Sequence, residues 1–176
     1  NKIASSDRKY RSIFNRSING IFQTNVSGQF LAANQTLAIM LGWDSPEDLI
    51  ENLTDISRQL YANSKDRKKL LEELQEKRIV TEFFTKFKRK DGDLIDVQLT
   101  ASILDNDETG EPYIEGIIED ITQRRKTEEA LRLSEEKFFK AFNNCPVSIV
   151  ITLMETGEYL EVNETFLKTM GHHRSG

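Results

Sequence analysis

The chain has few of the residues that disulfide-stabilised, metal-binding or membrane-spanning proteins need. Its 176 residues include one cysteine, two histidines and three prolines. Cys145 cannot form an internal disulfide, which fits a reducing compartment and predicts a cytoplasmic location. No apolar run approaches the ~18 residues that a membrane helix requires, and the N-terminal residues are not typical of a signal peptide.

An excess of positive charge is also missing. The net charge is -5, and the lysines and arginines are interspersed with aspartates and glutamates. Because nucleic-acid binding needs clustered basic residues, we expect no nucleic-acid partner. The composition, 38% hydrophobic and 30% charged, is typical of a globular protein with one domain or slightly more.

Catalytic and metal-binding groups are absent as well. The sequence shows no nucleophile with its base, no phosphate-binding glycine loop and no metal-ligand spacing. His172 and His173 are adjacent, so they would not face one metal together. The glutamates between positions 128 and 136 are typical of a solvated helix face rather than a catalytic pair. We therefore expect no enzyme activity in this chain and no metal site.

The first half of the sequence predicts short helices around a hairpin. Turn and cap signals mark each boundary, including Gly28 in the hairpin turn and Pro46 at a first helical position. The expected elements are a helix from Ser5 or Ser6 to about Asn15, strands over Gly20–Asn25 and Gln29–Ala33, and helices that begin at Asn34 and Ser45.

The second half predicts one amphipathic helix and three long strands. Ser64–Lys77 has leucines on one side and charges on the other. From Ile79 to Lys88 apolar and polar residues alternate, and Asp91-Gly92 predicts a hairpin turn. The strand after this turn alternates in the same way, with Thr100 on its solvent-facing side. A last strand is expected from Tyr113 to Ile121.

The stretch from Asp120 to Phe142 contains neither glycine nor proline and is rich in helix-forming residues. It predicts one continuous helix of roughly 30 Å. Asp120 and Gln123 have the spacing of a capping box. Ile121, Leu131 and other apolar residues follow one heptad seam that charged residues interrupt, so a coiled-coil linker would be weak by itself.

The chain also contains an internal repeat. GQFLAANQTL, which begins at Gly28, resembles GEYLEVNETF, which begins at Gly157. Three glycine and cap positions share one offset of 129 (157−28, 163−34, 171−42), and upstream pairs share an offset of 128 (142−14, 152−24). The sequence therefore predicts one complete unit, a connector, and the start of a second unit.

These stretches resemble the PAS sensor domain in its variant with a C-terminal PAC motif. The resemblance rests on Tyr10–Asn25, Gly28–Gly42, the Lys88–Gly92 hairpin and the D-I-T signature at Asp120-Ile121-Thr122. It implies an α+β fold, in which a five-stranded antiparallel sheet carries short helices on one face and a long C-terminal connector helix follows. The implied parts are an N-terminal amphipathic helix (1–17), a complete PAS/PAC domain (18–122), a connector helix (123–142) and a truncated second PAS domain (143–176).

The resemblance implies a sensory and dimerisation module of a bacterial signal-transduction protein, such as a two-component sensor histidine kinase or a diguanylate cyclase. The output domain would lie downstream, and Asp120, Ile121 and Thr122 would transmit the signal to the connector. The alternative is a ligand-free scaffold for protein–protein interactions. A homodimer is expected, with candidate contacts at Tyr10, Ile13 and Phe14.

A cavity inside the sheet would hold any ligand. The complete unit has no cysteine for a flavin adduct and residues 1 to 171 have no histidine for haem, so no cofactor is evident, and any ligand would be small and mostly apolar. Alternation places these pocket candidates inward: Ile21, Gln23, Leu31, Leu37, Met40, Leu41, Leu70, Leu74, Phe83, Thr85, Val97, Leu99, Ile114 and Ile118. The competing interpretation is a core packed without a cavity.

Overall fold

The computed structural model describes residues 12–107 and 109–171. The chain divides into two compact units, Asn1–Gln123 and Arg124–Gly176. Residues 12–16 are helical, whereas Ser5, Ser6 and Tyr10 at the start and both histidines near the end lie outside the described residues.

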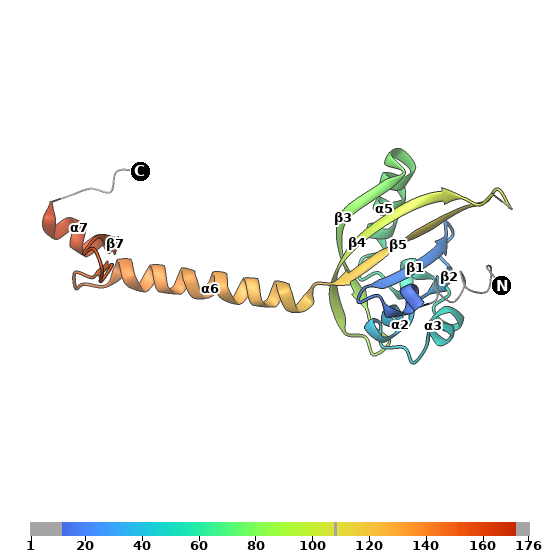
Figure 1. Ribbon diagram of the computed structural model, residues 1–176, viewed down its shortest axis with the longest axis horizontal. Helices are drawn as coiled ribbons and strands as arrows, with labels where there is room; N and C mark the ends of the chain where they lie inside the picture. Colours follow the sequence, from blue (N-terminus) through green and yellow to red (C-terminus); the bar gives the residue numbers. More distant parts are fainter. Residues whose placement is uncertain (1–11, 108, 172–176) are drawn as a thin grey trace. The chain divides into compact units, whose positions relative to one another are not determined.

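The first unit is built on one antiparallel sheet, as the sequence predicted (Figure 1). The spatial order is β2-β1-β5-β4-β3, so the last strand in sequence lies at the centre. The strands are β1 (Gly20–Asn25), β2 (Phe30–Ala33), β3 (Ile79–Lys88), β4 (Leu94–Asp105) and β5 (Pro112–Asp120). Because β5 pairs with both β1 and β4, it joins the two hairpins into one layer.

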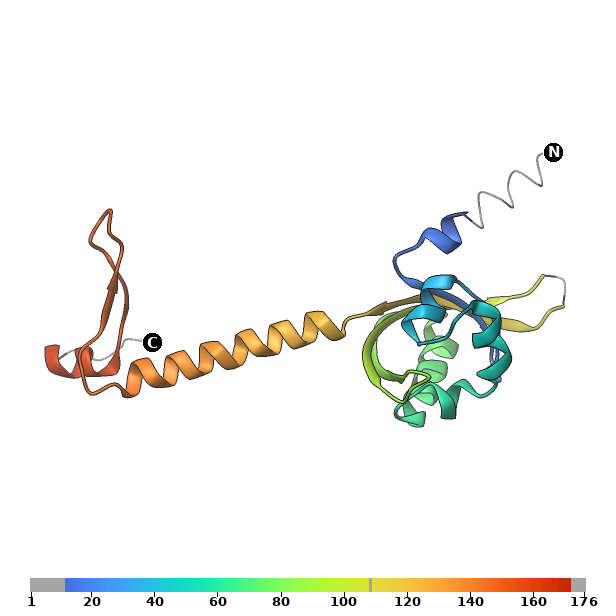
Figure 2. The ribbon, with the colours of Figure 1, turned by 90° about the horizontal axis from the view of Figure 1, so that it is seen from below.

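Four helices cover one face of this sheet (Figure 2). They are α2 (Gln35–Met40), α3 (Pro46–Asn52), α4 (Ile56–Gln59) and α5 (Ser64–Lys77). Asn34 and Ser45 cap α2 and α3 as predicted, since their side chains accept the backbone N–H groups of Leu37 and Asp48. The four-residue α4 was not predicted, because it is too short to show a helical period.

The predicted alternation holds along β4, where every second residue from Ile95 to Ile103 is buried. It fails in β3. A bulge between Val80 and Phe83 places Glu82 at a φ of 55°, so that the two buried residues are separated by two exposed ones. The unbroken period of two predicted for β3 is therefore wrong.

The connector is one continuous helix, α6 (Thr122–Asn144), as predicted. Its exposed acids form ion pairs within the helix, because Arg132 contacts Glu129 at 2.7 Å and Glu136 at 2.6 Å. At the start of this helix the Thr122 backbone N–H donates to Asp120 Oδ1 at 2.9 Å, and the capping box of Asp120 and Gln123 stays a prediction.

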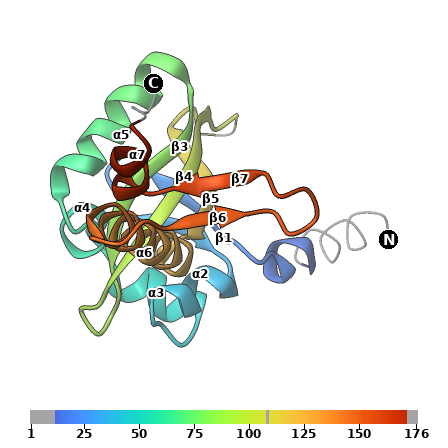
Figure 3. The ribbon, with the colours of Figure 1, turned by 90° about the vertical axis from the view of Figure 1, so that its left-hand side faces the viewer.

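The second unit continues from α6 into β6 (Val150–Thr152), β7 (Tyr159–Val162) and α7 (Glu164–Met170). The two strands lie side by side as an antiparallel pair (Figure 3). Several apolar side chains of this unit are exposed, among them Val147 and Leu160. Because the sequence supplies only the first strands of this second sheet, it predicts that residues 146–171 are exchanged or paired between chains or else disordered, and this stays a prediction.

Two buried asparagines make the same four hydrogen bonds in the two units. Asn34 accepts from the N–H groups of Ile21 and Leu37 and donates to the carbonyls of Phe14 and Asn19. Asn163 has four equivalent bonds, with the N–H groups of Ile149 and Phe166 and the carbonyls of Phe142 and Val147. All partners correspond at the offsets of 128 or 129 seen in the sequence. The local structure around the cap is thus repeated as well as the sequence.

Candidate functional site

The end of β5 is tied to its neighbours by the D-I-T residues. Asp120 Oδ2 accepts from Arg89 Nη2 at 3.3 Å, and its Oδ1 accepts from the Thr122 N–H at 2.9 Å. Thr122 Oγ1 accepts from the Asp96 N–H, and the Ile121 N–H donates to the Asp96 carbonyl, both at 2.9 Å. The first turn of α6 is therefore bonded to the start of β4 and, through Arg89, to the β3–β4 hairpin.

An internal cavity lies between the sheet and the helices. Its volume is about 10 Å³, which is room for one water-sized group. Three polar side chains line it: Arg67, Thr24 and Tyr61. The remaining walls are apolar and consist of Phe22, Phe30, Ile56, Leu60, Phe87, Leu99 and Ile118.

The three polar side chains in this cavity are almost completely buried. Arg67 is 4% exposed and Thr24 is 1% exposed, and neither Arg67 Nε nor Thr24 Oγ1 has a hydrogen-bond partner. Burial raises the pKa of Tyr61 above its usual value, and the neighbouring Arg67 guanidinium partly opposes that shift. Tyr61 is therefore a neutral hydroxyl at physiological pH.

Tyr61 connects the cavity to β3. Its ring packs edge-on against Phe87, with ring centroids 4.8 Å apart, and the two residues form an isolated β-bridge. The flanking residues continue this pairing, since the Lys88 N–H donates to the Leu60 carbonyl at 2.7 Å. Phe87 lies two positions before Arg89, so the cavity wall and the Arg89–Asp120 bond share one strand end.

The other face of the sheet carries a second hollow, a groove of about 400 Å³. Ile13, Phe14, Ile21 and Ile117 provide its apolar lining, while Gln23 and Glu115 contribute a hydrogen bond of 3.2 Å. Ile21 and Ile117 are paired across β1 and β5. We call this surface the outer groove.

The predicted pocket residues separate into two groups. Those on the core side are buried: Leu37, Leu41, Leu70, Leu74, Phe83, Thr85, Val97, Leu99, Ile114 and Ile118. Of these, Leu99 and Ile118 line the internal cavity, whereas Thr85 turns its hydroxyl to Asp66 at 2.7 Å.

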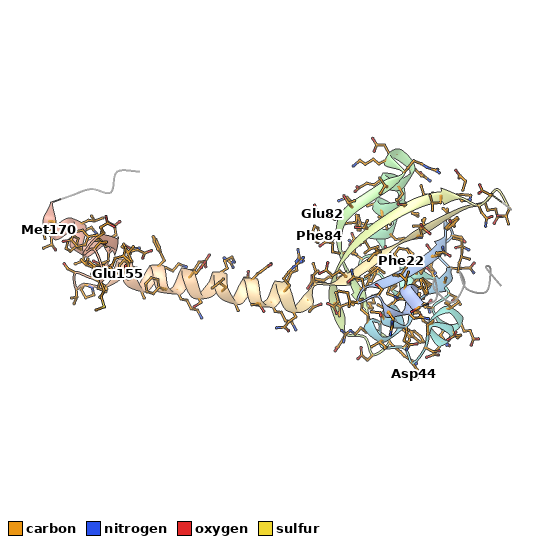
Figure 4. The ribbon with its side chains drawn as sticks, viewed as in Figure 1. Phe22, Asp44, Glu82, Phe84, Glu155 and Met170 are labelled. Carbon is orange, nitrogen blue, oxygen red and sulfur yellow. The ribbon has the colours of Figure 1, made fainter. Side chains whose placement is uncertain are left out.

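The remaining four candidates are not in the core. Leu31 is 55% exposed, Met40 is half-buried, and Ile21 and Gln23 line the outer groove. The inward orientation predicted for Ile21 and Leu31 is therefore wrong by one residue of register. The residues that face inward are Phe22, Thr24 and Phe30. Figure 4 labels Phe22 on β1.

The sequence interpretation missed Arg67 and Tyr61. A signal for Arg67 was present, since it precedes Leu70 by three positions and Leu74 by seven and so shares their helix face. Charged residues are rarely buried, so Arg67 was assigned to the solvated side. Tyr61 follows the short α4 in a segment without periodicity.

Metal-binding clusters and membrane-spanning helices are both absent from the residues that the structure describes. Within 12–107 and 109–171, no cluster of three or more His, Cys, Asp or Glu side chains is arranged to hold a metal ion. None of the helices that the structure describes combines the length and the apolar surface that crossing a bilayer requires.

Comparison with known proteins gives a family match. The profile of the PAS fold family matches residues 8–121. No curated protein sequence matches the chain. Many solved structures do, and at identities this low their similarity concerns the fold.

Three of these structures illustrate the similarity. The PAS domain of an HTR-like protein from Haloarcula marismortui is 19% identical with a TM-score of 0.54, and the match covers 68% of this chain and 95% of that one. A PAS domain from a two-component sensor histidine kinase is 18% identical with a TM-score of 0.54, covering 66% and 98%. A sensory box histidine kinase/response regulator from Burkholderia thailandensis is 22% identical with a TM-score of 0.52, covering 75% and 98%.

Proposed function

The chain belongs to the PAS family, and from this premise we propose that it is the non-catalytic sensory and dimerisation module of a signal-transduction protein. The parent protein would be of the sensor histidine kinase or diguanylate cyclase type, with its output domain downstream of this chain. One observation carries the proposal: Asp120 and Thr122 bond the first turn of α6 to both the β3–β4 hairpin and the start of β4. A displacement of these strands would therefore move the base of the helix.

We further propose that residues 143–176 begin a second PAS domain. The hydrogen bonds of Asn163, which correspond one by one to those of Asn34, support this assignment. The equivalent bonds from Thr36 Oγ1 to the Ser17 carbonyl (2.7 Å) and from Thr165 Oγ1 to the Cys145 carbonyl (2.6 Å) support it as well. In this arrangement α6 connects two sensory units.

The coupling route is tested by removing the Asp120 carboxylate. Asp120→Ala deletes the charge-assisted hydrogen bond from Arg89 and the hydrogen bond from the Thr122 backbone N–H. Together these two hydrogen bonds stabilise the base of α6 by about 1 to 3 kcal/mol. We expect hydrogen exchange in the first turn of α6 to accelerate at least tenfold, while amides of the central strands keep their rates. Asp93→Ala, an exposed carboxylate on the same hairpin, serves as the control and should change neither.

Signalling itself requires an output. We suggest joining residue 144 in helical register to the catalytic region of a histidine kinase without its own sensor. Autophosphorylation should depend on the helical phase of the junction, and Asp120→Ala should reduce that dependence while Asp93→Ala should not. Activity that is insensitive both to phase and to Asp120→Ala would contradict the proposed transmission.

Dimerisation through the outer groove is the second part of the proposal. Ile117 is 44% exposed at the centre of the sheet and lies beside Ile21, and Ile13 is also exposed. A glutamate at position 117 would place a charge in this apolar surface. We expect Ile117→Glu to weaken the homodimer at least tenfold in sedimentation equilibrium. Leu94→Glu, at an exposed apolar position outside the groove, should leave the dimer intact. If Leu94→Glu dissociated the dimer and Ile117→Glu did not, this interface would be excluded.

A ligand-free protein-interaction scaffold is the alternative function. The small volume of the internal cavity and the exposed apolar side chains of the outer groove favour it. Phe84, labelled in Figure 4 next to Glu82, adds a further exposed aromatic side chain, 48% accessible, on β3. Mass spectrometry of the protein purified under native conditions distinguishes the two, because a sensor should retain a small molecule and a scaffold should be empty.

A further inference from the structure

The β3–β4 hairpin contacts two different parts of the first unit through two adjacent residues. Arg89 donates to Asp120, which is bonded to the first turn of α6. Lys90, the next residue, contacts the α2–α3 segment (residues 35–52) instead. Its backbone N–H donates to the Leu41 carbonyl at the end of α2, at 2.9 Å. The hairpin therefore links this helical segment to the start of the connector helix.

The Lys90 side chain makes two further contacts with the α2–α3 segment. Its Nζ lies 3.1 Å from Asp48 Oδ2 in the first turn of α3 and 4.5 Å from the centre of the Trp43 ring, in a cation–π arrangement. The other Asp48 oxygen accepts from Asn52 at 2.9 Å, which fixes the carboxylate on α3. Trp43 packs against the hydrophobic core. Lys90 thus joins the hairpin to a carboxylate on α3, an aromatic ring and the last carbonyl of α2.

The anchor points of Lys90 belong to a segment that is packed into the core. Leu37 on α2 and Leu49 on α3 are completely buried. Between the two helices, Gly42 has a φ of 81°, a conformation that residues with a side chain rarely adopt, and the turn it forms lies against Lys90. A change in the packing of α2 or α3 would therefore move the groups that Lys90 contacts.

The contact between Arg89 and Asp120 can exist in two arrangements. In the structure it is a single hydrogen bond of 3.3 Å from Nη2, and the buried Nε has no partner. Arginine and a carboxylate pair most strongly when two parallel N–H groups are bonded at once. A small displacement of the hairpin would decide between one and two hydrogen bonds at the carboxylate that also accepts the Thr122 N–H.

We propose that Lys90 is a positioning residue through which the α2–α3 segment sets the geometry of the Arg89–Asp120 pair and thereby the order of the first turn of α6. The inference rests on the proposed sensory function and adds the place at which a change in the helices enters the transmission route. A shift of α2 or α3 moves Lys90, the hairpin follows, and the balance between the two arrangements of the pair changes.

Lys90→Met in the whole chain tests this role. Methionine keeps an unbranched side chain and removes the charge, so the contacts with Asp48 and Trp43 are lost while the backbone bond remains. We expect amide hydrogen exchange in the first turn of α6 to accelerate about threefold and the Arg89 Nε–H resonance to shift. Lys90→Arg keeps a cation that can pair with Asp48 and stack on Trp43, so it should restore both readings to the wild-type values.

Two comparisons separate positioning from a general loosening of the hairpin. Lys88→Met removes the charge of a lysine in the same hairpin whose Nζ donates to the Arg58 carbonyl in α4, and it should change neither reading. In the Asp120→Ala background, Lys90→Met should cause no further acceleration, because the pair through which it acts is already lost. Equal acceleration in Lys88→Met, or full acceleration by Lys90→Met without the Asp120 carboxylate, would overturn the proposal.

Failure of this inference and failure of the proposed function give different results. If Asp120→Ala accelerates exchange in α6 while Lys90→Met changes neither exchange nor the Arg89 resonance, the transmission route stands and Lys90 is not its entry point. If Lys90→Met accelerates exchange but autophosphorylation of the kinase fusion is insensitive to helical phase and to Asp120→Ala, the positioning role of Lys90 stands and the signalling function is excluded.

Discussion

Replacing Gly116 with alanine is expected to destabilise the first unit by about 3 kcal/mol, through steric overlap at the centre of the sheet. Gly116 lies in β5 and pairs with Phe22 on one side and Ala101 on the other. A Cβ atom there would overlap the Thr100 carbonyl oxygen and lie 3.0 Å from both the Ala101 Cα and the Phe22 ring. Because the overlapping atom belongs to the backbone, no side-chain rotation can relieve the overlap.

Urea denaturation measures this effect, and two further variants define its cause. Gly116→Ala should lower the unfolding midpoint with an unchanged m-value. Adding Phe22→Leu should not restore stability, since the carbonyl overlap persists. Gly92→Ala, at a hairpin position with open space and a φ of 94°, should cost only about 1 kcal/mol of backbone strain. A Gly116→Ala variant as stable as Gly92→Ala would show that the sheet can move apart at this point.

The elements that were predicted correctly carry two agreeing local signals. Residues 45–52 have a serine cap and a proline at the first helical position, and β4 alternates cleanly between apolar and polar side chains. The connector helix was predictable because no glycine or proline interrupts it and its composition favours helix. In each case the local preference and the tertiary structure coincide.

The first hairpin failed because its local signals conflict. In β1 isoleucine and phenylalanine are neighbours, as are glutamine and threonine, so either face can be assigned to the core. Only pairing with the central strand β5, distant in sequence, decides the register: it places Phe22 opposite Gly116, where the absence of a side chain leaves space for the ring. Alternation within the strand contains no information about that space.

The candidate site was predictable only in part, for a related reason. The D-I-T residues were identified from a resemblance, and the structure adds their partners Arg89 and Asp96. Arg67 and Tyr61 could not be identified from composition, because the property that marks them is the burial of a polar side chain. That property depends on the packing of α5 against β3 and on the path of the chain after α4.

The second large effect concerns Asn34. Asn34→Ala removes four hydrogen bonds, among them the bond to the N–H of Leu37 at the start of α2. Losing a hydrogen bond to a buried or partly buried group costs about 1 to 3 kcal/mol, and the four losses are not additive, so we expect a loss of about 4 kcal/mol in the stability of the first unit. Chemical denaturation followed by circular dichroism measures this loss.

The repeat supplies the matched control for this prediction. Asn163→Ala removes the same four bonds at the corresponding positions of the second unit. Since Asn163 lies outside the first unit, we expect the unfolding midpoint of that unit to be unchanged. The amides of Ile149 and Phe166 should nevertheless lose their protection against hydrogen exchange, as those of Ile21 and Leu37 do in Asn34→Ala. If Asn163→Ala left these amides protected, the bonds would not hold the second copy together, and the structural equivalence of the two asparagines would have no energetic counterpart.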